Sequence, residues 1–209
     1  SGIDDLITRG FGNVALDSRS SWRLGYTSPF GHPVTIDLEY GRFQEGLAGW
    51  TERVTSSAKF SVTDGLSVEG SATIQNSDDW LLGDETGQVA NYRLRFRQFG
   101  VNLLWRLAEG QELSFKAQSY FFDADQGQAV FYAGGPDVDK FNAESFAVGE
   151  LASQIRYRWR FAPLSDFYLA YMRNGSHYDE MARSKGDVLE AMYQEPNDNL
   201  LMAKFRYMF

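Results

Sequence analysis

Nine segments of this chain alternate apolar and polar side chains with a period of two, and this pattern constrains the fold more than any other feature. Because successive side chains of a β-strand point to opposite faces, the alternation predicts strands with one apolar and one polar face. The predicted strands cover residues 21–26, 34–40, 53–63, 66–75, 92–105, 112–121, 154–161, 167–171 and 201–209. We therefore predict an all-β, antiparallel fold.

The alternation changes phase once, within residues 92–105. Apolar residues occupy even positions from Tyr92 to Phe96 and odd positions from Phe99 to Trp105. An extra residue in one strand shifts its side chains to the opposite face, so a β-bulge near Gly100 would explain the change. This interpretation places three arginines on the polar face: Arg93, Arg95 and Arg97.

The composition favours a membrane-embedded sheet and excludes several other classes. Aromatic residues make up 15% of the 209 residues, as expected of barrels anchored in lipid by aromatic girdles. No run of about 18 apolar residues is present to form a transmembrane helix. The net charge of −8 argues against binding to nucleic acid, and the absence of cysteine excludes disulfides and thiol-based sites.

The connections between predicted strands alternate in length. Short links fall near residues 28–33, 63–66, 107–111 and 161–165, and long ones near 44–51, 77–90, 123–148 and 174–199. Bacterial outer-membrane barrels join strands by short periplasmic turns and longer external loops. The last strand also resembles the C-terminal signal that the barrel assembly machinery recognises, through Phe205, Tyr207 and Phe209. We predict an up-and-down transmembrane β-barrel in the bacterial outer membrane.

Nine predicted strands is an odd number, whereas single-chain bacterial barrels have an even one. One solution is a tenth strand between Leu6 and Asp17, where the alternation is poor. The other is that residues 1–209 form a single domain that is part of a larger barrel, completed by another domain or chain. Both alternatives stay open from the sequence.

The polar face carries many charges that oppose one another on neighbouring strands. The predicted lumen-facing ladder comprises Arg93, Arg95, Arg97, Glu112, Lys116, Arg156, Arg158, Arg160, Lys204, Arg206, Asp37, Glu39 and Glu69. Pairing of opposite charges across strands would compensate their desolvation. With about ten strands, side chains would largely fill the interior, so we expect little conduction. In a soluble β-sandwich, the alternative, the same residues would be ordinary surface.

Candidates for catalysis and metal binding are few, and we predict no catalytic residue, no metal and no cofactor. His32 lies in a short turn, and Ser176 and His177 are neighbours that would point to opposite faces of an extended strand. No Gly-rich phosphate loop or dinucleotide fingerprint is present. The acidic loops are interpreted as solvated surface, with sites that bind divalent cations or bridge lipopolysaccharide as the alternative.

Residues 60–67, 78–81, 111–118 and 155–171 resemble a known family. It is the C-terminal barrel domain of bacterial outer-membrane proteins with an N-terminal, family-9-like carbohydrate-binding domain, and the resemblance covers most of residues 51–209. It implies an outer-membrane barrel of largely uncharacterised function. We expect outer-membrane lipid and lipopolysaccharide as partners of such a barrel. Compared with this family pattern, we expect residues 1–209 to hold no counterpart of the sugar-binding domain or of the first barrel strands.

The sequence therefore predicts a non-enzymatic barrel that acts as a pore, an uptake component or a membrane anchor. A barrel enzyme acting on lipid or lipopolysaccharide is one alternative. A soluble β-sandwich or lipocalin-like binding protein is the other.

Overall fold

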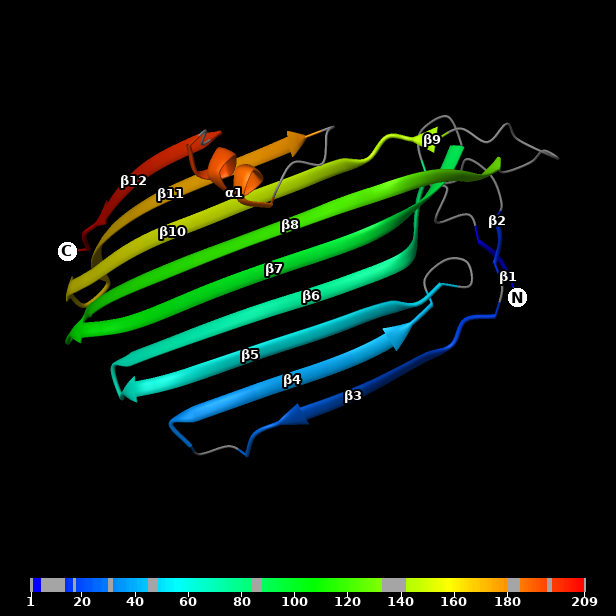
Figure 1. Cartoon of the computed structure of the whole chain (residues 1–209). Coiled ribbons are helices and arrows are strands. Elements are labelled where there is room, and N and C mark those ends of the chain that lie inside the picture. Colours follow the sequence, from blue (N-terminus) through cyan, green and yellow to red (C-terminus); the bar gives the residue numbers. More distant parts are fainter. Residues whose placement is uncertain are drawn as a thin grey trace.

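One antiparallel sheet dominates the computed structural model of the chain (Figure 1), which describes residues 2–4, 14–16, 18–29, 32–44, 49–83, 88–132, 142–179, 185–194 and 197–208. Its strands are β3 (Ser21–Thr27), β4 (Val34–Phe43), β5 (Thr51–Thr63), β6 (Leu66–Gly83), β7 (Gln88–Ala108), β8 (Gln111–Tyr132), β10 (Phe146–Ala162), β11 (Ser165–Asp179) and β12 (Asp198–Arg206). Each strand pairs with its predecessor in this series. The predicted all-β, up-and-down fold is confirmed.

The two edges of this sheet are β3 and β12, and no pairing joins them among the described residues. Closure into a barrel therefore stays a prediction. The short strand β9 (Asn142–Ala143) adds to the loop end of β8. Phe209, the predicted last residue of the closing strand, lies outside the described part of the chain.

The described part of the predicted tenth strand, residues 14–16, lies outside the main sheet. Within residues 6–17, the structure describes only residues 14–16, which form β2 (Val14–Leu16) and pair with β1 (Gly2–Asp4) in a separate two-stranded sheet. The side chains of both short strands lie outside the described part of the structure.

Five strands extend further toward the loop end than the alternation predicts: β6, β7, β8, β10 and β11. β6, β7 and β8 continue through much of the regions predicted to be long loops, at residues 77–90 and 123–148. Trp80 pairs with Tyr92, and Arg93 with Asp125, beyond the last regular alternation. Strand pairing rests on backbone hydrogen bonds, so it continues where the side-chain pattern no longer shows a simple apolar and polar face.

The opposite end of the sheet has tight turns. Residues 64–65, 109–110 and 163–164 connect β5 to β6, β7 to β8 and β10 to β11. Gly110 has a φ of +72°, and a Cβ there would collide with the carbonyl oxygen of Arg160, so this turn requires glycine. We call the end with these turns the turn end and the other the loop end; they lie at the left and right of Figure 1.

One helix, α1 (Lys185–Gln194), lies between β11 and β12 in the sequence and packs against β10 and β11. The sequence predicts only a long loop at residues 174–199, which include this helix. No helix in the described part of the chain is long and apolar enough to cross a membrane.

Candidate functional site

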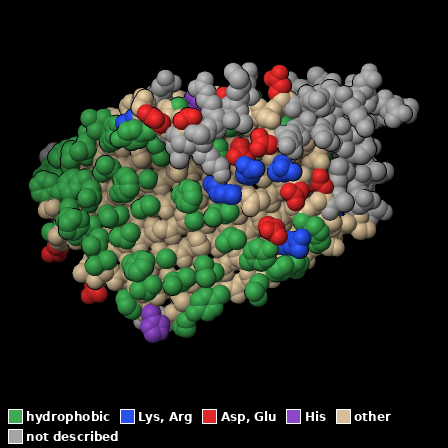
Figure 2. All heavy atoms as spheres, in the orientation of Figure 1, with side chains coloured by type: hydrophobic (Ala, Val, Ile, Leu, Met, Phe, Trp, Pro, Cys, Tyr) green, Lys and Arg blue, Asp and Glu red, His purple; other side chains and the backbone are tan. Residues whose placement is uncertain are grey.

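The sheet has two chemically distinct faces, which the strand register defines because directly paired residues point to the same side. One face, the apolar face, carries Trp22, Leu24, Tyr26, Ile36, Leu38, Val54, Phe60, Ile74, Phe99, Val101, Trp105, Ile155, Trp159, Leu201 and Phe205. The opposite face is the polar face. Figure 2 looks onto the apolar face, where hydrophobic side chains spread over the turn end and the middle of the sheet.

The apolar face is exposed. Leu24 is 69% exposed, Phe60 48% and Phe205 65%. Every strand of the main sheet from β3 to β12, except β8 and the short β9, contributes an exposed large apolar side chain to this face, so the exposed surface crosses the sheet and is not a local patch. Soluble monomers rarely expose apolar surface on this scale, and its presence marks contact with lipid or with another protein.

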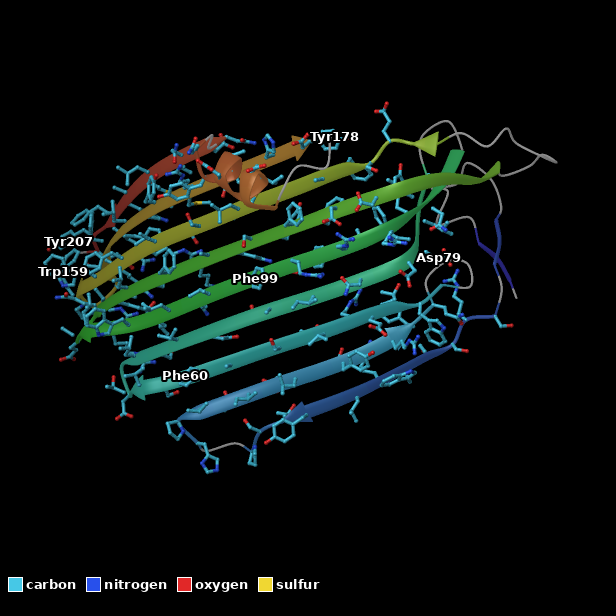
Figure 3. The ribbon with its side chains drawn as sticks, in the orientation of Figure 1. Phe60, Asp79, Phe99, Trp159, Tyr178 and Tyr207 are labelled. Atoms are coloured by element: carbon cyan, nitrogen blue, oxygen red, sulfur yellow. The ribbon has the colours of Figure 1, made fainter. Side chains whose placement is uncertain are left out.

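Aromatic rings gather on this face at the turn end. Phe161 stacks on Phe205 at 5.5 Å and on Tyr207 at 6.4 Å between ring centroids, and it meets Trp159 edge-on at 5.6 Å. Figure 3 shows Trp159 and Tyr207 together near this end, whereas Phe99 lies further along the sheet. Two of the three residues of the predicted assembly signal, Phe205 and Tyr207, thus belong to this group of rings.

The apolar character stops at nearly the same register on five adjacent strands. Moving two residues toward the loop end exchanges an apolar side chain for a polar or charged one on each of them. The pairs are Tyr40 and Arg42, Val54 and Glu52, Ile74 and Asn76, Phe99 and Arg97, and Phe121 and Asp123. The apolar face therefore has a sharp boundary that crosses the strands.

Beyond this boundary lies a cluster of charges on the same side of the sheet. Arg42 pairs with Glu52 at 3.6 Å, and Arg93 with Asp78 at 3.9 Å. Figure 2 shows a group of charged side chains toward the loop end, adjoining the hydrophobic surface. Figure 3 shows that Asp79 also lies toward this end.

The prediction that Arg93, Arg95 and Arg97 lie on the polar face is wrong. Pairing of β7 with β6 and β8 runs without a shift past Gly100, so no bulge interrupts the strand there. The three arginines therefore lie on the same side as Phe99. The chemistry of the face changes along the strand, whereas the strand itself keeps its phase.

The polar face changes in the opposite sense at the loop end, where it becomes aromatic. Tyr92 lies 6.1 Å from Trp80 and 5.5 Å from Phe146, and Phe122 lies 5.9 Å from Phe146. Tyr92 is almost buried. The strand pattern does not predict this cluster. Its signal in the sequence is the series of even-numbered apolar residues from Tyr92, which a phase slip would place on the apolar face.

Closer to the turn end, the polar face carries the rest of the predicted ladder. The register places on it Glu112, Lys116, Arg156, Arg158, Arg160, Lys204, Arg206, Asp37, Glu39 and Glu69. The carboxylate of Asp166 accepts a hydrogen bond from Arg206 at 2.7 Å and lies 3.9 Å from Arg158. Arg23 pairs with Glu39 at 3.3 Å. Opposite charges on this face thus lie on neighbouring strands, as the sequence predicts.

A hollow of about 410 Å³ lies on the polar face and is lined by residues of β6, β7, β8, β10 and β11. Its polar lining consists largely of amides: Gln98, Asn102, Gln118, Gln154 and Asn174. Lys116 and Glu69 add one charge of each sign. The hollow therefore offers many hydrogen-bonding groups and little net charge.

Helix α1 covers part of the apolar face near the loop end. Val188 and Met192 are 1% exposed, and Val188 packs with Phe121 and Ala147. The guanidinium of Arg173 donates to the carbonyl oxygen of Tyr193 and lies 4.8 Å from the centroid of its ring. A cation at the last turn of a helix complements its dipole and caps a free carbonyl.

The candidate catalytic residues are not brought together. Ser176 pairs with Glu150 on the polar face, whereas His177 pairs with Gly149 on the apolar face. The side-chain amide of Asn197 donates to the Ser176 hydroxyl. Among the described residues, no group of three His, Asp or Glu side chains is placed to hold a metal ion.

Comparisons of the chain with protein families, with curated proteins and with solved structures find no match. The family resemblance drawn from the sequence is thus still a prediction.

Proposed function

We propose that this chain forms an outer-membrane β-barrel, alone or with strands from another segment or chain, with its apolar face toward lipid. The polar face then lines the interior. We further propose that it acts as a non-enzymatic passage or uptake component for small polar solutes. The single observation that carries the proposal is the continuous, exposed apolar face that ends at one boundary on five adjacent strands.

The height of the apolar face suits a bilayer. From Phe99 to Leu107, β7 advances about 27 Å, and from Leu151 to Phe161, β10 advances about 34 Å, at roughly 3.4 Å per residue. Strands tilted by about 40° would convert these lengths into a band about 20–26 Å tall. Transmembrane barrels have apolar bands about 25 Å tall, flanked by aromatic girdles.

The reversal of both faces at the loop end also supports this proposal. A strand that leaves the bilayer meets water on its outer side, so charges such as Arg93 and Glu52, each about half exposed, can be hydrated there. The inner side of that strand then lies beyond the membrane-embedded part of the barrel. Its side chains can pack together into a small core, as Tyr92 does. In a soluble sandwich, the surroundings of the two faces do not change along a strand. They would not cause both faces to switch between apolar and polar residues at nearly the same register.

The hollow on the polar face favours a passage or binding role over a bare anchor. An anchor has no need of a cavity lined by five amide side chains, whereas a passage for polar solutes needs groups that replace the solute's water. The separation of Ser176 and His177 on opposite faces argues against a lipid-hydrolysing pair.

Single-cysteine labelling tests the proposed orientation, and the chain has no native cysteine to interfere. We expect an environment-sensitive fluorophore on Val101→Cys or Ile155→Cys to be quenched by brominated acyl chains in liposomes. The matched controls Asn102→Cys and Gln154→Cys are each one residue away, on the polar face. They should resist this quenching and react with a water-soluble thiol reagent.

Equal quenching within each pair, or folding without detergent and without lipid contact at Val101, would contradict the proposal. That outcome would favour a soluble sheet whose apolar face is covered by another protein.

A further inference from the structure

The boundary of the apolar face carries two arginines, Arg95 and Arg97, that form no ion pair in the described part of the chain. Arg97 donates to the carbonyl oxygens of Gln75 at 3.0 Å and Phe96 at 2.7 Å, and to the side-chain oxygen of Asn76 at 2.9 Å. All three acceptors are neutral. Within the described part of the chain, the Nε of Arg97 and the guanidinium of Arg95 make no hydrogen bond or ion pair.

The surroundings of these two residues leave them available to an anion. Arg97 lies opposite Ile74 on one side and Phe121 on the other, both apolar. Asp123 lies opposite Arg95 and is 7% exposed, but no ion pair within 4 Å joins the two side chains. The third arginine of the series, Arg93, is already paired with Asp78 and is not part of this site.

The apolar neighbours indicate what kind of anion fits. Phe99 is 52% exposed and Val101 46%, and both lie on the same face, directly toward the turn end from Arg97. A ligand that covered these side chains and also reached the guanidinium groups would need an apolar part and an anionic head. The two guanidiniums are carried by alternate residues, about 7 Å apart along the strand. Arginine binds phosphate through two parallel N–H groups.

We propose that Arg95 and Arg97 bind the phosphate of a membrane lipid whose acyl chains lie against Phe99 and Val101. This inference rests on the proposed function, because it needs the apolar face to meet lipid. It adds a specific headgroup chemistry and a fixed position on the outer wall. At this boundary, the headgroup would neutralise the charge that the protein leaves uncompensated.

Native mass spectrometry of the full chain in a non-ionic detergent tests the site, with phosphatidic acid as the probe. We expect wild-type protein to retain one phosphatidic acid more strongly than diacylglycerol, which lacks the phosphate. The double variant Arg95→Gln/Arg97→Gln should bind it about tenfold more weakly or worse, because two charge-assisted contacts are lost. The matched control Lys116→Gln/Arg156→Gln removes the same charge from the polar face and should bind as the wild type does.

Three results would overturn the site. They are wild-type affinity in the Arg95→Gln/Arg97→Gln variant, an equal loss in the control, and displacement of the lipid by a similar concentration of inorganic phosphate. The last would indicate a free-anion site.

If the double variant does not fold, Arg97→Lys replaces it. It keeps the charge but loses the paired N–H geometry, so intermediate affinity is expected, and unchanged affinity would contradict the site. If Val101→Cys is quenched by lipid but the arginine variants bind phosphatidic acid as the wild type does, the lipid-phosphate site is contradicted and the proposed function is not. If Val101→Cys is not quenched by lipid, the proposed function is contradicted as well.

Discussion

The carboxylate of Asp166 on β11 accepts a hydrogen bond from Arg206 on β12 at 2.7 Å and lies 3.9 Å from Arg158 on β10. One acid thus joins the last three strands of the sheet on the polar face. Its side chain is 14% exposed, whereas the two arginines are about half exposed. Asp166 is therefore the member of this group whose loss would leave charges uncompensated.

Asp166→Asn should lower the free energy of unfolding by about 1–2 kcal/mol, because it leaves two guanidiniums without their acid on adjacent strands. Urea unfolding in detergent micelles measures this change. Glu39→Gln removes the acid of the more exposed pair with Arg23 and should cost less than about 1 kcal/mol. Equal costs would show that burial of Asp166 has no energetic consequence.

A charge on the apolar face should oppose insertion into bilayers. Ile155→Arg places a guanidinium near the middle of the band on β10, where about 2–4 kcal/mol is expected for a lipid-facing position. Folding into liposomes, followed by urea titration, measures the loss. Gln154→Arg, on the polar face, is the matched control and should cost far less. If Ile155→Arg folds as well as the control, lipid does not meet this face.

The alternation of side chains was sufficient to predict nine strands and their order along the chain, because a period of two has few other structural explanations. It also assigned the faces correctly wherever one face stays apolar, as from Phe99 to Trp105. It failed from Tyr92 to Arg97, where both faces change character. A pattern of residue types alone does not distinguish a change of environment from a change of phase.

Two other features could not be predicted for related reasons. The loop-end parts of β6 to β8 pair through backbone groups, and their side chains show no simple alternation. Helix α1 is short, and Val188 and Met192 become its buried side only because β10 and β11 offer Gly149 and Gly175 beneath them. That match of helix and glycine is a property of the tertiary structure, so the sequence alone predicts a loop there.

Glycine at position 175 should be required for α1 to stay on the sheet. A Cβ at Gly175 would collide with the backbone carbonyl of Met192, which cannot move without shifting the last turn of the helix. Gly175→Ala should therefore increase hydrogen exchange of the amides in residues 187–193 while the strands stay protected. Gly70→Ala on the same face is the control, since a Cβ there meets nothing within 4 Å. Unchanged exchange in Gly175→Ala would indicate that the helix does not pack as described.

The aromatic cluster on the polar face should restrict passage at the loop end. Trp80, Tyr92, Phe122 and Phe146 contact one another there across β6, β7, β8 and β10, and Tyr92 is almost buried. If the polar face lines a passage, Phe122→Ala removes a ring that touches two of the others and should raise single-channel conductance in planar bilayers.

The size of the conductance change separates a passage from an anchor. Phe99→Ala is the matched control, because it removes a ring of the same kind from the apolar face of β7 and should leave the conductance unchanged. A rise confined to Phe122→Ala would support an interior path limited by the aromatic cluster. Conductance near zero in the wild type and in both variants would contradict the passage and leave the membrane anchor as the function of this sheet.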